Sequence, residues 1–171
     1  MKKYEFTGET KEIRLLFRTA TLHRIRATVA FGIVEVGDLG GWIEKEENLS
    51  HEGKAWVWGN AKVWGNAKVC GDAEVCGDAE VWGNAKVFSA SHVLVIGAIG
   101  SRNDFTTFYR DKDNEITVKC GCFLGKIDRF LEKVTQTHGD SKYALVYRAA
   151  VEVAKLQIDL SGEAPKDADE E

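Results

Sequence analysis

Arginine, threonine and tyrosine side chains recur between residues 102 and 148, together with isolated glycines. A guanidinium with threonine hydroxyls and free backbone N–H groups suits a phosphate, and an aromatic face suits a nucleotide base. The residues predicted to bind a ligand are Arg102, Thr106, Thr107, Tyr109, Arg110, Gly121, Gly125, His138, Tyr143 and Arg148. Their spacing is not that of a phosphate-binding loop. An alternative stays open, in which Arg102 pairs with Asp104 or Asp128 and the glycines only turn the chain.

Two of the four cysteines, Cys120 and Cys122, are one residue apart and would share one face of a strand, with His138 as a third candidate ligand. Structural zinc sites use four ligands and a longer Cys-to-Cys spacing. Cys70 and Cys76 are expected to point apart. We therefore predict no metal and no cofactor. Small buried thiols, kept reduced in a cytoplasm, are the expected role of the cysteines.

The elements that must position these residues begin with a repeat. Residues 57–86 read VWGNAK VWGNAK VCGDAE VCGDAE VWGNAK, five six-residue units without an insertion. A period of six would smear the apolar pattern around an α-helix, whereas Gly followed by Asn or Asp favours a short strand and a corner. Three units make one triangular layer, with Val in the interior and Ala near each corner.

The same frame predicts ten units between Leu39 and about Ser101. Outside the perfect units, the residues expected at the Val position are Leu39, Lys45, His51, Val87, Val93 and Ile99. Those expected at the Ala position are Ile43, Leu49 and Ala55. An offset of three units predicts the charge stack Glu44–Lys62–Glu80, the amide ladder Asn48–Asn66–Asn84 and the like-charged pair Lys68–Lys86.

These units resemble those of the hexapeptide-repeat proteins, and the resemblance implies a left-handed parallel β-helix. The segments MKKYEFTGET, GDLGGWIEKEENLSHEG and KCGCFLGKIDRFLEKVTQTHGDSKYA extend the resemblance to a family encoded by phages and prophages, with a C-terminal CGCF…THG domain. The expected fold class is therefore mainly β. It is a short three-sided left-handed parallel β-helix of about three coils, with an N-terminal β cap and a C-terminal α+β domain.

The flanking residues supply the expected caps. Short strands are predicted at Tyr4 to Phe6, Ile13 to Phe17, Thr21 to Ala27 and Phe31 to Val36. A β-hairpin is predicted from residues 105–110 and 115–120, then helices over 127–137 and from a cap at Asp140 to Ile158. The expected domains are residues 1–38, the N-terminal β cap; 39–101, the β-helix; 102–160, the C-terminal α+β domain; and 161–171, a disordered acidic tail.

The second position of each unit is expected to point to solvent. Exposed indoles stacked in successive layers would form an apolar patch of the size that monomers rarely leave uncovered. The residues predicted to form an interface are Trp58, Trp64, Trp82 and Phe88. We therefore expect a homo-oligomer, with the alternative that the stacked rings only stabilise successive coils.

Acyl transfer is the activity that many hexapeptide-repeat proteins carry, through a histidine and a loop extruded from a coil. No loop interrupts the perfect units here. His51 falls at an interior position, and His92 is expected outside, above Glu74, which would raise its basicity. Neither histidine has an evident third catalytic group, so we predict no catalytic residues. An acyltransferase stays an alternative.

The formal net charge of −4 equals that of residues 161–171, so the folded body is about neutral. A neutral body disfavours general nucleic-acid binding, and no segment is expected to be a signal peptide or a membrane span. With the phage resemblance, these features predict a non-enzymatic binding protein in the cytoplasm of an infected bacterium. It would counter host defence by sequestering a small nucleotide immune signal at domain or subunit seams. The alternative partner is a host defence enzyme that the protein inhibits by direct contact.

Overall fold

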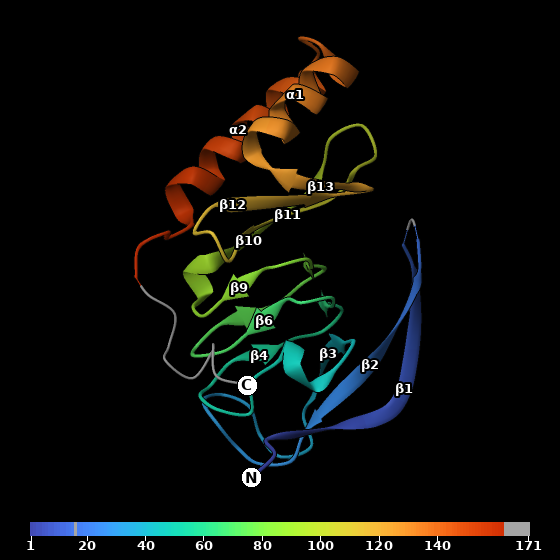
Figure 1. Ribbon diagram of the computed structural model, residues 1–171, viewed down its shortest axis with the longest axis vertical. Helices are drawn as coiled ribbons and strands as arrows, with labels where there is room; N and C mark the ends of the chain where they lie inside the picture. The colour runs from blue at the N-terminus through green and yellow to red at the C-terminus, as the bar shows by residue number, and fades with distance from the viewer. Residues whose placement is uncertain (16, 163–171) are drawn as a thin grey trace.

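The repeat folds into pairs of two-residue strands stacked in parallel (Figure 1). In this computed structural model, which describes residues 1–15 and 17–162, β4 pairs with β7, β5 with β8 and β6 with β9, each at an offset of three units. The strands are β4 (Trp56–Val57), β5 (Lys62–Val63), β6 (Lys68–Val69), β7 (Glu74–Val75), β8 (Glu80–Val81) and β9 (Lys86–Val87). The predicted offset of three units is confirmed for these pairs. We call residues 39–92 the repeat stack.

Valine and alanine fill the interior of the repeat stack. The valine of every perfect unit is no more than 1 % exposed, and the alanines are equally covered. Each buried valine side chain contributes roughly 1.5–3 kcal/mol by leaving water. The glycine of every unit has a positive φ, for example +66° at Gly77, which a residue with a Cβ adopts only with strain. The predicted interior and corner positions are therefore confirmed for these units.

The first layer departs from the predicted frame. Ile43, at the end of β3 (Leu39–Ile43), pairs with Val63, and Leu49 pairs with Val69, so both offsets exceed three units by two residues. Ile43 and Leu49 thus occupy the interior Val position, and the assignment of Lys45 to it is wrong. Two additional residues between Leu49 and Val57 restore the frame. The physical reason is that the frame chosen from the later units would have buried the Lys45 charge.

This shift also changes the predicted stacks. Lys62 pairs with Trp42 on one side and Glu80 on the other, and its Nζ lies 3.0 Å from the Glu80 carboxylate. Asn48, in the short 3₁₀ turn Glu46–Asn48, is buried and donates to the carbonyls of Gly65 and Ala67. The predicted amide ladder is therefore wrong at its first member. The pairing of Lys68 with Lys86 is as predicted.

The N-terminal residues form one long antiparallel hairpin rather than four short strands. It consists of β1 (Tyr4–Arg14) and β2 (Thr19–Ala27), and residues 31–36 contribute only an isolated bridge. Because β2 pairs with β3, the sheet order is β1-β2-β3-β5-β8, and the hairpin runs up the side of the repeat stack (Figure 1). The hairpin therefore covers a side of the repeat stack, in addition to the predicted role of closing one end.

The base of the repeat stack is closed by the start of the chain. Tyr4 packs in the core of the stack, and its hydroxyl donates to the Leu49 carbonyl at 2.8 Å. The Lys3 ammonium is almost fully buried and donates to the Ala55 carbonyl at 2.8 Å. Burial lowers the pKa of Lys3 to about 8. The predicted N-terminal capping contact is present at this end.

The hairpin covers one of the aromatic faces that were expected to be open. Trp64 stacks on Trp82 with ring centroids 5.8 Å apart, as the offset predicts, but Leu22 of β2 packs over it and leaves it 1 % exposed. Phe88 is also buried, beneath Arg110. The predicted solvent exposure is wrong for these two rings, while Trp58 and Trp82 are half-buried. Their role in an oligomer interface stays a prediction.

The repeat stack ends earlier than predicted, at the 3₁₀ turn Ala90–His92. Residues 93–99, expected to continue the units, form β10 (Val93–Ile99) and pair antiparallel with β11. The corner Gly-Asn pair is missing there, so nothing turns the chain back into the stack. The four-stranded sheet has the order β10, β11 (Asp104–Arg110), β12 (Ile116–Cys120) and β13 (Phe123–Lys126).

Two helices cover the face of this sheet that points away from the repeat stack (Figure 1). They are α1 (Ile127–His138) and α2 (Lys142–Gln157), close to the predicted bounds. The N-cap of α2 is Ser141 rather than Asp140. The hairpin of β11 and β12 is confirmed, whereas β13 was not predicted.

The chain is thus mainly β with a two-helix region near its C-terminus. Among the described residues, no helix is long and apolar enough to cross a membrane. Residues 163–171 of the predicted acidic tail lie outside the described part of the chain.

Replacing Val75 with alanine removes two methyl groups from the centre of the repeat stack. We expect the free energy of unfolding to fall by about 2 kcal/mol, because the cavity left behind cannot collapse. Cys76→Ala, at the exposed neighbouring position, is the control and should change it by less than about 0.5 kcal/mol. Urea unfolding followed by circular dichroism measures both. Equal losses would contradict the interior position of Val75.

Candidate anion-binding site

Strand β11 carries four of the ten predicted ligand-binding residues, and alternate ones face opposite layers. Tyr109 faces the repeat stack, where its hydroxyl donates to the Trp82 carbonyl at 2.8 Å. The Thr107 hydroxyl accepts from the backbone N–H of Glu80 at 3.1 Å. Both side chains are buried and anchor the sheet to the stack. Burial raises the pKa of Tyr109 well above its ordinary value.

Glu80 adds a further contact between the four-stranded sheet and the repeat stack. Its carboxylate lies 3.0 Å from the ammonium of Lys62 in the stack and 3.0 Å from that of Lys119 in β12. Burial would raise the pKa of Glu80, but the two lysines outweigh it and lower the pKa. The repeat stack and the four-stranded sheet are therefore in packed contact at this position.

The remaining predicted residues divide between two other places. Thr106 is buried against Cys120, while Arg102 approaches Gly121, and Gly125 pairs with Val118 in the ladder. His138, Tyr143 and Arg148 gather at the start of α2. Arg148 donates to the Gly139 carbonyl at 3.0 Å and so satisfies a backbone carbonyl at the C-terminal end of α1.

Arg110 is the predicted residue with the most unusual surroundings. Its side chain is 2 % exposed, beneath residues 161–162 that follow α2. Since α2 has 16 residues and spans about 24 Å, the cluster at His138 lies at the far end of that helix. The structure therefore does not bring the predicted cations Arg110 and Arg148 into one site.

All hydrogen bonds of the Arg110 guanidinium among the described residues are with neutral groups, and Asp159 interacts with its charge without a hydrogen bond. Its Nε and Nη2 donate to Asn114 Oδ1 at 3.0 and 2.5 Å. Nη1 donates to the Ser161 carbonyl at 3.0 Å, and Nη2 to the Gly162 carbonyl at 2.6 Å. The ring of Phe88 lies 5.7 Å away. A buried charge is normally compensated by an opposite one, so this guanidinium is suited to an anion.

His92 adds a second donor beside Arg110. The backbone N–H of Phe88 donates to His92 Nδ1 at 3.0 Å, so the proton of the neutral ring is on Nε2. Nε2 lies 3.2 Å from Arg110 Nη1, which is also a donor. Two N–H groups this close cannot satisfy each other, but both can point to one oxygen atom. A phosphate or carboxylate oxygen is such an acceptor.

The position of His92 corrects the sequence interpretation. The side chain is buried rather than exposed above Glu74, because the 3₁₀ turn Ala90–His92 directs it back to Phe88. Burial, and then the Arg110 charge, lower the pKa of His92 rather than raise it. His51 lies at the base, where its ring stacks on Tyr4 at 4.3 Å and Nδ1 accepts from the Lys3 N–H.

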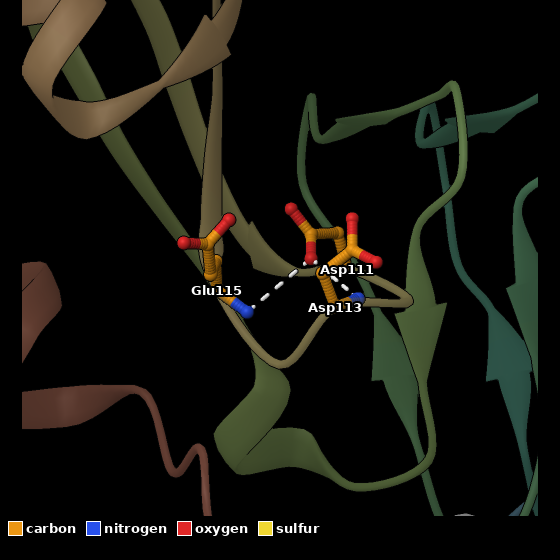
Figure 2. A group of neighbouring side chains, drawn as sticks. All are labelled: Asp111, Asp113 and Glu115. Carbon is orange, nitrogen blue, oxygen red and sulfur yellow. Dashed lines mark hydrogen bonds between the residues drawn. The ribbon is translucent and has the colours of Figure 1, made fainter.

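Three carboxylates follow Arg110 in the β11–β12 turn. Asp111, Asp113 and Glu115 each place an oxygen within 4.8 Å of the others (Figure 2). This group was not predicted, although acidic residues at alternate positions of a turn are visible in DKDNE.

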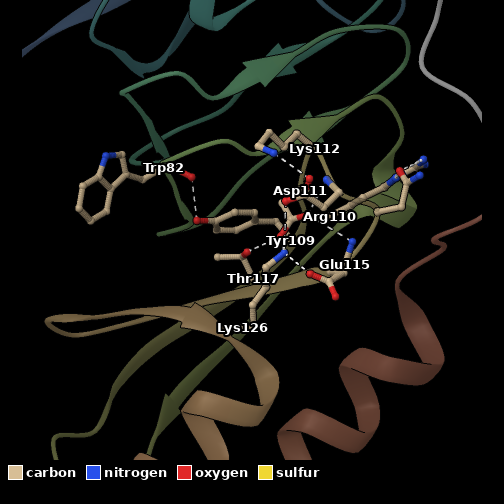
Figure 3. A network of polar contacts seen from close by, with 10 residues as sticks. Trp82, Tyr109, Arg110, Asp111, Lys112, Glu115, Thr117 and Lys126 are labelled. Atoms are coloured by element: carbon tan, nitrogen blue, oxygen red, sulfur yellow. Dashed lines mark hydrogen bonds and ion pairs between the residues drawn. The ribbon is translucent and has the colours of Figure 1, made fainter.

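The Lys126 ammonium lies between the carboxylates of Asp111 and Glu115 (Figure 3), with Asp113 Oδ2 3.8 Å away. Its Nζ lies 2.5 Å from both Asp111 Oδ2 and Glu115 Oε2. Burial would raise the pKa of Asp111, but Lys126, the Thr117 hydroxyl and two backbone N–H groups outweigh it and lower the pKa. A metal ion would have to displace this ammonium, so we interpret the group as a support that fixes the turn behind Arg110.

No disulfide joins any of the four cysteines, all of which lie within the described residues. Cys122 is exposed, whereas Cys120 is half-buried against Thr106, so the two thiols do not share one environment.

No protein-family model matches this chain, and a search of curated proteins returned no match. Membership of the hexapeptide-repeat family of phages therefore stays a prediction, which rests on the sequence motifs alone.

The lowered pKa of His92 predicts a pH dependence of stability. Because the unfolded ring takes up a proton at higher pH than the folded ring, this stability is fully present above the unfolded pKa of about 6.5 and is lost as the pH falls from there through the lower pKa of the folded ring. The loss is at most about 1.4 kcal/mol per pH unit for one histidine. In urea unfolding at pH 7.5 and 5.5, His92→Gln should show a smaller loss than the wild type.

His51→Gln is the comparison, because burial also lowers the pKa of His51. It should remove a separate share of the pH dependence, and the double variant should remove both. An unchanged pH dependence in His92→Gln would contradict a neutral ring beside Arg110.

Proposed function

We propose that this protein is a non-enzymatic binding protein that sequesters a small ligand carrying a phosphate or similar oxyanion, with Arg110 as the main anion-binding group. The observation that carries the proposal is a buried guanidinium whose described hydrogen-bond partners are all neutral. An oxyanion in place of the Ser161 and Gly162 carbonyls would supply a negative charge in direct contact with it, closer than the Asp159 carboxylate, which makes no hydrogen bond to it. His92 Nε2–H would donate to the same oxygen as Arg110 Nη1.

The nucleotide part of the proposal has a different basis. Tyr109 and Phe88 are buried, so neither offers an open face for a base in this arrangement. What supports a nucleotide is the resemblance of the sequence to phage proteins, for which a small nucleotide immune signal of the host is a fitting target. The proposed setting is accordingly the cytoplasm of an infected bacterium, with the protein acting in counter-defence.

Binding is favoured over acyl transfer by the state of the two repeat-stack histidines. Both use Nδ1 to accept a backbone N–H, and His51 is stacked against Tyr4. Neither is thereby arranged as a base beside a described nucleophile. Inhibition of a host enzyme through the tryptophan faces is the less supported alternative, since Trp64 is covered by the chain itself.

The scaffold proposed for this site is a short left-handed parallel β-helix. Parallel pairs at an offset of three units, buried valines and positive-φ glycines at the corners support it. The hairpin of β1 and β2 and the C-terminal α+β domain then serve as its caps. A homo-oligomer is part of the same proposal.

Isothermal titration calorimetry against inorganic phosphate, cyclic nucleotides and ADP-ribose tests the function. We expect a subset of these to bind and phosphate to compete. Arg110→Lys keeps the charge but loses the forked donors, so it should weaken binding by about 10-fold or more. Arg148→Lys is the matched control and should leave the affinity unchanged.

A chain ending at Leu160 gives a second measurement. It lacks the two carbonyls that occupy Arg110, so its affinity for the same ligands should rise. The proposal is wrong if neither the full chain nor the shortened chain, both folded by circular dichroism, binds any of these anions at millimolar concentration.

A further inference from the structure

Helix α2 is apolar on two opposite faces. One face packs on the sheet and α1 through Ala144, Tyr147, Ala150, Val151 and Ala154. The other carries large apolar side chains in solvent: Leu156 is 89 % exposed and Leu145 59 %, with Val146 and Val153 beside them. These residues recur at helical spacing, so they form one continuous stripe along the outer side of α2. We call Leu145, Val146, Ala149, Val153 and Leu156 the α2 stripe.

The α2 stripe has the character of an interface. Its exposed apolar area is on the order of 400 Å², close to the largest apolar patches that monomers leave in water. Residues 163–171, the part of the chain that follows, contain no large apolar side chain with which to cover it. Neither the described residues nor this segment covers the α2 stripe, so it is open to another molecule.

We infer that the α2 stripe is the contact for a second copy of this chain, with the two α2 helices antiparallel about a two-fold axis. A two-fold contact uses the same surface twice, so a self-complementary stripe meets its requirement. In the antiparallel register centred between Ala149 and Glu152, Leu145 lies opposite Leu156 of the second copy, and the reverse. The small Ala149 side chain near the axis lets the helices approach closely.

The charges at the two ends of α2 favour the same orientation. Lys142 begins the helix and is exposed. The antiparallel register opposes the two helix dipoles and places Lys142 of one copy near the C-terminal, negative end of α2 in the other. A parallel arrangement would bring like charges together. Charge complementarity therefore selects the antiparallel pair.

The area indicates how strong this contact is. Two stripes together bury about 800 Å² of apolar surface plus a polar rim, which falls at the low end of specific interfaces. We expect a reversible dimer with a dissociation constant on the order of micromolar, not an obligate one. This contact is distinct from the tryptophan faces and does not depend on the proposed ligand.

Sedimentation equilibrium of the full chain between about 1 and 200 µM measures the association. Leu156→Glu should weaken it by at least about 10-fold, because a charge would be buried at the contact. Ile33→Glu is the matched control, since Ile33 is 75 % exposed and lies outside α2, and it should leave the dimer intact. Both variants alter exposed side chains and are expected to fold.

Cysteine cross-linking tests the orientation in a background with Cys76 and Cys122, the exposed thiols, changed to serine. The antiparallel register predicts a disulfide-linked dimer for Leu145→Cys combined with Leu156→Cys, and little from either alone. A wild type that stays monomeric throughout, or a dimer that survives Leu156→Glu, would overturn the inference. Cross-linking by a single cysteine variant would overturn the antiparallel register. Loss of the dimer on Trp58→Ala or Trp82→Ala instead would assign the contact to the tryptophan faces.

Discussion

The structure depends on one packing constraint, that a valine must enter the same narrow interior at every sixth position. Six such valines in succession are almost completely removed from water. Because the interior is filled by small side chains of nearly fixed size, neither a charge nor a large ring can replace them without strain or a desolvation cost. Aromatic and charged residues are thereby placed on the outside, where the N-terminal hairpin and the C-terminal sheet use them as contacts.

Arg110 illustrates how a scaffold of this kind can carry an unusual group. Its strand is held to the repeat stack by Tyr109 and to the following turn by Asp111, so the backbone on both sides of the arginine is fixed. The guanidinium is positioned between Asn114, His92 and the segment after α2. Its surroundings are thus determined by elements from four parts of the chain, and hydrogen bonds to neutral groups, with the charge of Asp159 further away, offset the cost of burying the charge.

The sequence predicts the perfect repeat units, the β11–β12 hairpin and both helices, because each has a strong local period. The first layer is mispredicted because its units are irregular in sequence. The two additional residues near Leu49 therefore cannot be recognised from the repeat pattern. The apolar pattern of residues 93–99 fits a repeat unit and an antiparallel strand equally well. For the site, Arg110 was identified from its chemistry, but its partners His92 and Ser161 come from distant positions that local patterns do not connect. Trp64 was expected in solvent because no pattern in the repeat reveals what covers it.

The backbone groups at the two rims of the repeat stack have a consequence for how copies of it can associate. At the upper rim, the carbonyls of Trp82 and Asn84 and the amide of Glu80 are taken by Tyr109, Lys112 and Thr107. At the lower rim, Tyr4 and Lys3 take the carbonyls of Leu49 and Ala55. Among the described residues, these edges offer few open hydrogen-bonding groups for another strand, so strand-by-strand extension of the repeat stack into fibres is disfavoured.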